Sequence, residues 1–254
     1  MHQRDKVREQ LAFAKDIGSR AAAYAAHAVD DMVGTNVQVS EINSGLFRVA
    51  SLMEMVTDPA NRAVGICARV EGKAPGHALF LFPYASAPAL VDKVEGKPVG
   101  TTSQLGTSEL SVLKELGYTL ISSSLSAFAK ETGLAFRMTP PQMMVDMAWA
   151  IVSNVFTLAL ATDEKAVMVA SRFGDGPGVL DGLFLFIPAP GSLQIMQAAR
   201  AQRMGLAVDL GEFAQETAEQ DQDSRRLNIE PEKQPDNAIA LSMWDLDYDQ
   251  QSAA

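Results

Sequence analysis

The sequence predicts an α+β domain in which two copies of one unit share a sheet and each copy begins with a long, exposed helix. Three observations lead to this fold class. Short motifs recur at a nearly constant spacing, helical and strand-like segments follow the same order in both halves, and no linker rich in proline, glycine or serine separates the halves. We assign the two repeats to residues 10–100 and 105–205, within a domain that spans 1–208.

Five pairs of motifs indicate the duplication. Residues 15–18 (KDIG) recur 99 residues later as 114–117 (KELG), and Gly34 recurs at the same spacing as Gly133. The order of all five matches is preserved, and the small drift in spacing is typical of insertions in loops. The other three pairs are 63–69 with 166–172, 75–76 with 177–178, and 79–83 with 183–188.

Each predicted copy contains the same elements in the same order. The long helices cover about 5–33 and 107–132, and each ends at a glycine, which is a common helix terminator. Thr107 or Ser108 is expected to cap the second helix. The further elements of the two copies are extended segments (37–40; 135–138), shorter helices (49–57; 143–160), paired strands (62–71 with 76–83; 165–174 with 179–187) and closing helices (85–95; 191–204).

The charge of the chain is concentrated at its end. The net charge is −10, and residues 209–254 contribute −9 of it, with 12 acidic and 3 basic residues. Residues 1–208 are therefore nearly neutral, which argues against nucleic acid as the main partner, because phosphate binding requires a concentrated positive field. We expect this acidic tail to be disordered. Its apolar cluster around Trp244 is compatible with a docking peptide or with a simple disordered terminus.

The composition excludes several other classes of protein. The single cysteine, Cys67, rules out a disulfide framework and a multi-cysteine metal site, and its place in a strand-like run predicts a buried packing role. The first ten residues carry no apolar segment typical of a secretory signal. The longest apolar stretch is interrupted by Asp146, Ser153 and Asn154, so it does not predict a membrane span. We therefore expect a cytoplasmic protein.

The second long helix has two distinct faces. Ser111, Glu115, Tyr118 and Ser122 lie at i, i+4, i+7 and i+11, which places them on one row away from the apolar face. By pattern alone, such a row is typical of a solvated helix surface. The corresponding row of the first helix is Ala12, Asp16, Ser19 and Ala23, and the apolar face of the second helix consists of Leu113, Leu116, Leu120, Ile121, Ala127 and Phe128.

The second helix and the segment after it resemble a known family. SELSVLKELGYTLISSSLSAFAKETGL and PPQMMVDMAWAIV are similar to the second repeat of the CheC/CheX/FliY phosphatases of bacterial and archaeal chemotaxis. Helices of that family carry Asp or Ser, then Glu four residues later, then Asn three residues after that. Ser111 and Glu115 match this pattern, and Tyr118 stands in the place of the asparagine. The resemblance extends over about residues 10–205.

The resemblance implies a function and a partner. Family members dock on a phosphorylated receiver domain of the CheY type, where the glutamate pairs with a receiver lysine and the asparagine positions a water for attack on the aspartyl phosphate. The receiver holds the magnesium, so the chain is expected to need no cofactor or metal of its own. The resemblance also makes a CheD-type deamidase a possible second partner. It assigns catalytic roles to Asp16, Ser19, Glu115 and Tyr118, and partner contacts to Ser111 and Ser122.

Departures from the family pattern leave two leading hypotheses open, beside a third in which a protein of the family fold has an unrelated partner. Neither copy keeps the asparagine, since Ser19 and Tyr118 replace it, and Asp16 is one methylene shorter than the family glutamate. The first hypothesis is a phosphatase of the receiver, with Ser19 or Tyr118 as the water-positioning group. The second is a non-catalytic adaptor that binds a response regulator or another chemotaxis protein.

Overall fold

The structure is a computed structural model that describes residues 2–34, 37–48, 60–159, 165–174 and 181–206. All of these residues belong to the first of the two units into which the chain divides, Met1–Phe213. The helix predicted at 49–57, the acidic tail and the predicted domain boundary at 208 lie outside the described residues, so these expectations stay predictions.

Five α-helices and seven strands occur among the described residues. The helices are α1 (His2–Val33), α3 (Ala87–Val94), α4 (Thr107–Thr132), α5 (Ala148–Ala159) and α6 (Ser192–Arg203), and a short 3₁₀ helix (Tyr84–Ser86) precedes α3. The strands are β1 (Gln38–Arg48), β2 (Arg62–Gly72), β3 (Gly76–Pro83), β4 (Phe136–Met138), β5 (Gln142–Met147), β6 (Lys165–Gly174) and β7 (Asp181–Pro188).

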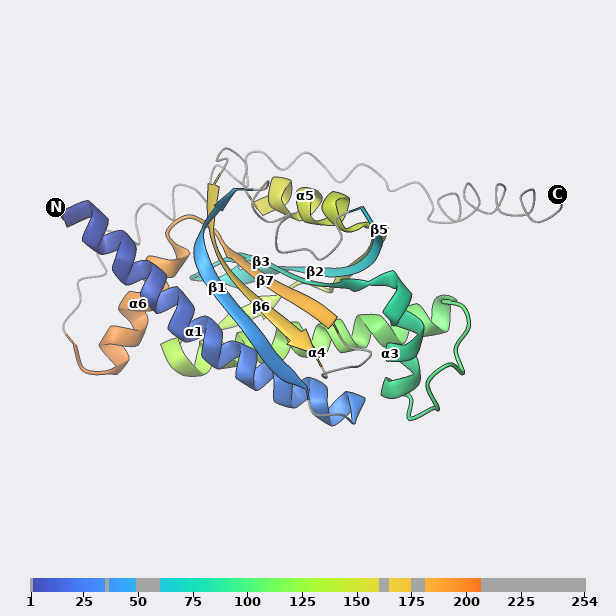
Figure 1. Cartoon of the computed structure of the whole chain (residues 1–254). Coiled ribbons are helices and arrows are strands. Elements are labelled where there is room, and N and C mark those ends of the chain that lie inside the picture. The colour runs from blue at the N-terminus through green and yellow to red at the C-terminus, as the bar shows by residue number, and fades with distance from the viewer. Residues whose placement is uncertain (1, 35–36, 49–59, 160–164, 175–180, 207–254) are drawn as a thin grey trace. The chain divides into compact units, whose positions relative to one another are not determined.

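The seven strands form one antiparallel sheet that both halves of the chain build together. Its order is β1-β6-β7-β3-β2-β4, and β5 also pairs with β2. β1 comes from the first half but pairs with β6 of the second, whereas β4 and β5 of the second half pair with β2 of the first (Figure 1). The predicted α+β class with a shared sheet is therefore confirmed.

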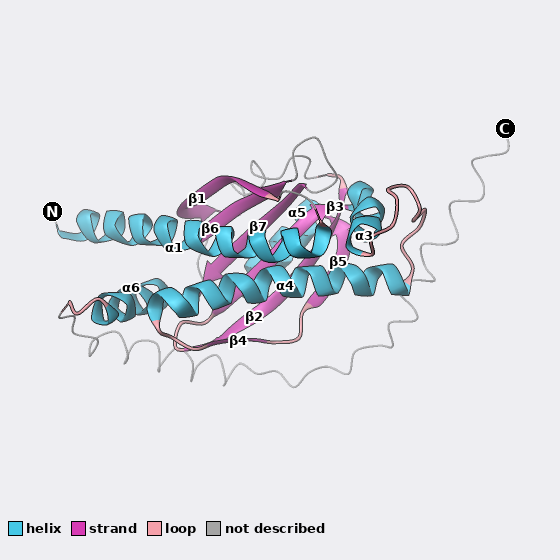
Figure 2. Cartoon of the chain, turned by 90° about the horizontal axis from the view of Figure 1, so that it is seen from below, coloured by secondary structure: helices cyan, strands magenta, loops and turns pink. Residues whose placement is uncertain are grey.

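Helices cover both faces of the sheet. Side chains alternate between the two faces of each strand, so β3 contributes Phe80 and Phe82 to one core and Leu79 and Leu81 to the other. The first core lies under α1, α3, α4 and α6, and the second lies under α5 (Figure 1). Viewed from the side of the four helices, α1 and α4 cross the sheet next to each other (Figure 2).

A glycine lets each long helix approach the sheet closely. A Cβ added at Gly18 of α1 would lie 2.2 Å from Val169 of β6, and one added at Gly117 of α4 would lie 2.4 Å from Ile66 of β2. Both distances are far below van der Waals contact, so only glycine fits at either position. Gly117 follows Gly18 by 99 residues and Val169 follows Ile66 by 103 residues, which are the two spacings between the predicted repeats. The two contacts therefore occupy equivalent positions in the two repeats. This equivalence supports the duplication, which itself stays a prediction from the sequence.

The ends of the long helices follow the sequence closely, with one correction. Gly34 and Gly133 have φ angles of 66° and 73°, in the left-handed region that glycine adopts easily. Helix α4 is preceded by Gly106 as its N-cap, so the predicted caps Thr107 and Ser108 are wrong. The side chain of Glu109 accepts a hydrogen bond from the Gly106 N–H at 2.9 Å and so fixes the first turn.

The segment 143–160 was predicted as one helix, and this expectation is wrong for its first part. Residues Gln142–Met147 form β5, in register with Arg62–Cys67 of β2, and the helix begins only at Ala148. A short apolar run is ambiguous between strand and helix, and pairing with the edge of β2 decides for the strand. The extended segment predicted at 37–40 is also only the beginning of the longer strand β1.

Asp92 fixes the turn that leads from α3 toward α4. Its buried carboxylate accepts hydrogen bonds from the backbone N–H groups of Gly100, Thr101 and Thr102 at 2.8 to 2.9 Å. Hydrogen bonding from Thr102, with the bonds from the other two residues, holds the pKa of Asp92 below its usual value. The approach of the chain to α4 is therefore set by one carboxylate.

The close contact of α4 with β2 predicts the effect of Gly117→Ala. We expect this variant to be destabilised by about 1 to 2 kcal/mol, because overpacking against Ile66 exceeds the gain of about 1 kcal/mol in helix propensity. Urea denaturation followed by circular dichroism measures the change.

Two further variants test the cause of this effect. Ser126→Ala, on the exposed side of α4, should change stability by less than about 0.5 kcal/mol. Ile66→Val removes a methyl group at the contact, so the double variant with Gly117→Ala should be more stable than the sum of the single effects predicts. Additive effects would contradict a direct contact.

Candidate functional site

The two predicted rows both lie on the outer side of the helix pair. Asp16 and Glu115 each precede by two residues the glycine that faces the sheet, and two residues turn a helix by about 200°, so both carboxylates point away from it. Ser111, Glu115 and Tyr118 are exposed and Ser122 is half-buried, while Ala12, Asp16, Ser19 and Ala23 are all exposed. The structure thus brings each predicted row together on its own helix.

Glu115 is an open carboxylate on α4. It forms no hydrogen bond or ion pair with another residue in the described part of the chain. Tyr118, one turn further along, is 49% exposed, so its phenol is accessible to a partner. The Ser111 hydroxyl donates to the Thr107 carbonyl at 2.9 Å, and the Ser122 hydroxyl donates to the Thr119 carbonyl at 3.1 Å. Both serine hydroxyls therefore keep acceptor lone pairs available on this face.

Asp16 on α1 is instead engaged by two arginines. Its two carboxylate oxygens form ion pairs with Arg200 of α6 at 2.5 Å and with Arg20, one turn along α1, at 3.5 Å. The hydrogen bond from Arg200, the charge of Arg200 and then that of Arg20 lower the pKa of Asp16. Asp16 is therefore an ionised side chain whose two oxygens already have partners.

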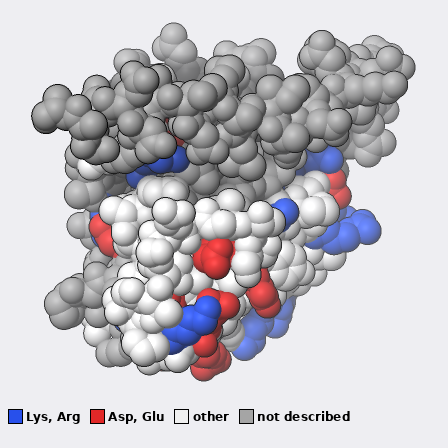
Figure 3. Space-filling model, turned by 90° about the vertical axis from the view of Figure 1, so that its right-hand side faces the viewer, with Lys and Arg blue, Asp and Glu red and all other residues white. Residues whose placement is uncertain are grey.

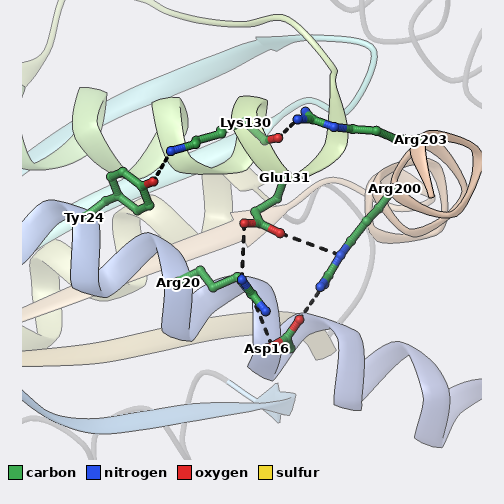
Figure 4. A network of polar contacts seen from close by, with 7 residues as sticks. All are labelled: Asp16, Arg20, Tyr24, Lys130, Glu131, Arg200 and Arg203. Atoms are coloured by element: carbon green, nitrogen blue, oxygen red, sulfur yellow. Dashed lines mark hydrogen bonds and ion pairs between the residues drawn. The ribbon is translucent and has the colours of Figure 1, made fainter.

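The contacts of Asp16 belong to a larger network that joins three helices (Figure 4). Glu131 of α4 pairs with Arg20 at 3.5 Å and with Arg200 at 3.7 Å. Lys130 donates a hydrogen bond to the Tyr24 hydroxyl, and Arg203 donates to the Lys130 carbonyl. We call the four residues Asp16, Arg20, Glu131 and Arg200 the clasp, because they connect α1, α4 and α6.

The two carboxylates lie near opposite ends of the helix pair. Helices α1 and α4 run side by side in opposite directions, with Arg20 opposite Glu131 and Tyr24 opposite Lys130 (Figure 2). Glu115 precedes Glu131 by 16 residues, which corresponds to about 24 Å along a helix. Asp16 and Glu115 therefore belong to two separate candidate sites.

Charged groups of both signs alternate with neutral ones on the side of the molecule where α3 lies. Figure 3 shows this side, with lysine, arginine, aspartate and glutamate scattered among uncharged residues. A surface of this kind does not create a strong field of one sign, so recognition there depends on individual side chains.

The single cysteine, Cys67, and the histidines His27 and His77 do not form a site together with the two rows in the described part of the chain. Cys67 is buried in β2, as predicted, and burial raises the pKa of its thiol to about 11. Burial lowers the pKa of His77, and the nearby charge of Arg69 lowers it further. His27 is exposed on α1. No group of three or more possible metal ligands occurs among the described residues. In the same residues, no helix is long and apolar enough to cross a membrane.

The clasp was missed by the sequence reasoning. The only signal for it was the i, i+4 spacing of Asp16 and Arg20, which is typical of an ion pair on a helix surface. Arg200 and Glu131 lie 184 and 115 residues from Asp16 in the sequence, so only the fold shows that Arg200 pairs with both Asp16 and Glu131.

In this fold, a pair of helices lies on one face of an antiparallel sheet. The outer side of the pair is exposed to solvent and carries the two carboxylates, Asp16 and Glu115. No family model matches the sequence. A similar protein is the CheY-P phosphatase CheC of Bacillus subtilis (strain 168), which is 24% identical over 169 residues, 66% of this chain and 81% of CheC. The crystal structure of FliY from Thermotoga maritima shares the fold, with a TM-score of 0.60 and 13% identity over 76% of this chain and 96% of that one. The resemblance to the CheC/CheX/FliY-like proteins that the sequence predicts is thus confirmed by similarity to CheC, and the chain shares the fold of FliY.

The clasp predicts a pH-dependent contribution of Asp16 to stability. Because the arginines lower its pKa, the contribution is present above the ordinary carboxyl pKa of about 3.9 and is lost as the pH falls through the lowered value. Since the side chain of Asp16 is 46% exposed, Asp16→Asn should cost only about 0.5 to 1 kcal/mol at pH 7.

Urea denaturation of both proteins at pH 7 and at about pH 2 measures this difference. It should vanish at the lower pH and shrink in about 1 M salt, which screens exposed ion pairs. Asp31→Asn, at another exposed carboxylate of α1, serves as the matched control and should change stability by less than about 0.5 kcal/mol. Equal effects of the two substitutions would contradict the role of the clasp.

Proposed function

We propose that this chain is a signalling protein that docks on a phosphorylated receiver domain of the CheY type through the first half of α4, and that it promotes hydrolysis of the receiver's aspartyl phosphate. The observation that carries the proposal is the open carboxylate of Glu115, flanked by Ser111 and Tyr118 on one exposed row. Similarity to the CheY-P phosphatase CheC supports the choice of partner. The roles of the individual residues are part of this proposal.

In this proposal Glu115 provides the docking charge. An exposed carboxylate with no partner among the described residues can pair with a lysine of the receiver without giving up an ion pair in that part of the chain. Ser111, one turn before it, offers a hydroxyl oxygen that can accept a further hydrogen bond from the partner. The contact of Gly117 with Ile66 holds this turn of α4 against the sheet, so the row is presented by a rigid element.

Tyr118 is the candidate for orienting the attacking water. Its phenol hydroxyl can both donate and accept a hydrogen bond. The family asparagine does the same with two groups, since its amide NH2 donates and its amide oxygen accepts. The water attacks the phosphorus, the bond between phosphorus and the aspartate oxygen breaks, and inorganic phosphate leaves the restored carboxylate. The magnesium ion that neutralises charge in this step belongs to the receiver, and no residue of this chain is assigned to it.

A second candidate function is a non-catalytic adaptor that binds the same receiver. It is favoured by one observation, the replacement of the asparagine by the bulkier Tyr118, which is exposed on the same row as Glu115. Losing the group that orients a reacting water costs orders of magnitude in rate, whereas docking requires only Glu115 and its neighbours. Both functions share the docking surface and differ in what Tyr118 does.

The decay of a phosphorylated CheY-type receiver distinguishes the two functions. We expect the unmodified chain to accelerate this decay. Glu115→Gln should weaken the acceleration, because it reduces binding of the receiver about fivefold. Tyr118→Phe should abolish the acceleration without weakening binding. The loss of only one hydroxyl in Tyr118→Phe separates water orientation from docking. Phosphate release and calorimetric binding are measured on the same proteins.

Matched controls test the assignment of these roles. Glu71→Gln removes an exposed carboxylate on β2, and Tyr24→Phe removes an exposed phenol on α1, and both should behave as the unmodified chain. Binding without acceleration would establish the adaptor. Neither binding nor acceleration with a fully phosphorylated receiver would overturn both functions.

A further inference from the structure

The two ends of the helix pair differ in what surrounds their carboxylates. One oxygen of Asp16 pairs with Arg200 and the other with Arg20, so a cation from a partner would compete with two internal arginines. The side chain of Arg200 is only 19% exposed, and its guanidinium lies 5.8 Å from the centre of the Phe13 ring. This arginine is therefore held in place from more than one side.

The charges around Asp16 also disfavour a cationic partner group. The network in Figure 4 contains four cationic side chains but only two anionic ones. A lysine that approached Asp16 would meet a surplus of positive charge, and repulsion would offset its attraction to the carboxylate. Of the other members of the row, Ser19 carries a single neutral hydroxyl, and Ala12 and Ala23 carry no polar side chain, so none of them supplies a compensating negative charge.

Two of the charged residues of the clasp, Arg20 and Glu131, have uncharged counterparts at the other end of the pair. The 99-residue spacing makes Thr119 the equivalent of Arg20, and Met32 the equivalent of Glu131. Neither residue carries a charge, so the ion pairs that Arg20 makes with Asp16 and Glu131 have no equivalent around Glu115 in the described part of the chain. One position of the duplicated motif is thus tied into the fold while the other is left open.

From this difference we infer that the two ends have separate tasks: Asp16 is a structural residue that fastens α6 to α1 and α4, and the receiver binds only at the Glu115 end, one receiver per chain. The inference rests on the proposed function, because it assumes that a receiver is bound. It adds to the proposed function that one receiver binds per chain and that no receiver binds at the Asp16 end. Asp16 and Ser19, given catalytic roles by the family resemblance, have no part in docking in this account.

Titration calorimetry with a CheY-type receiver held in its active form by beryllium fluoride and magnesium tests this inference. The full chain should bind one receiver, confirmed by sedimentation of the complex. Asp16→Asn should keep this stoichiometry and bind within about twofold of the unmodified chain. Glu115→Gln should bind about fivefold more weakly, the size expected for one exposed ion pair. Glu71→Gln again serves as the charge-matched control.

The possible outcomes separate this inference from the proposed function. Two receivers per chain, or a loss of affinity in Asp16→Asn equal to that in Glu115→Gln, would overturn the single-site inference and leave the proposed function intact. Absence of binding by the unmodified chain would overturn the proposed function, and the inference with it. One receiver per chain with dependence on Glu115 alone would support both.

Discussion

The close approach of two helix glycines to the sheet determines the arrangement of the whole helix layer. Gly18 meets Val169 and Gly117 meets Ile66 at distances that leave no space for a Cβ atom. Each contact joins a helix of one half to a strand of the other half, as the strand pairings of β1 and β4 also do. The halves consequently cannot complete their cores separately. The same contacts fix the rotation of both helices, and so direct Asp16 and Glu115 outward.

The same fold serves two different purposes at the ends of its helix pair. At one end, the carboxylate of Asp16 takes part in ion pairs that connect α1, α4 and α6. At the other, Glu115 lies open beside an exposed tyrosine. The predicted duplication is compatible with this difference, because each copy would keep its place on the sheet through its glycine while the side chains of its outer row change.

Most of the fold could be predicted from the sequence where a pattern is local. The helical pattern between Gly106 and Gly133 predicted α4 at its observed bounds, and strand-like runs joined by Gly/Pro turns predicted β3 and β6. The prediction was wrong at 143–147, where a short apolar run fits either element and the pairing with β2 decides. The exposure of the candidate rows followed from helical spacing. The clasp did not, because Arg200 reaches Asp16 through the packing of α6, which no local pattern indicates.

The most direct test of the account is to map where the receiver contacts the helix pair. Backbone amide resonances of the labelled chain can be followed while an unlabelled receiver, activated by beryllium fluoride, is added. The account predicts the largest shifts in residues 111–122 of α4, with residues 12–23 of α1 unaffected. Shifts centred on residues 12–23, or equal shifts in both segments, would contradict the assignment of docking to the Glu115 end.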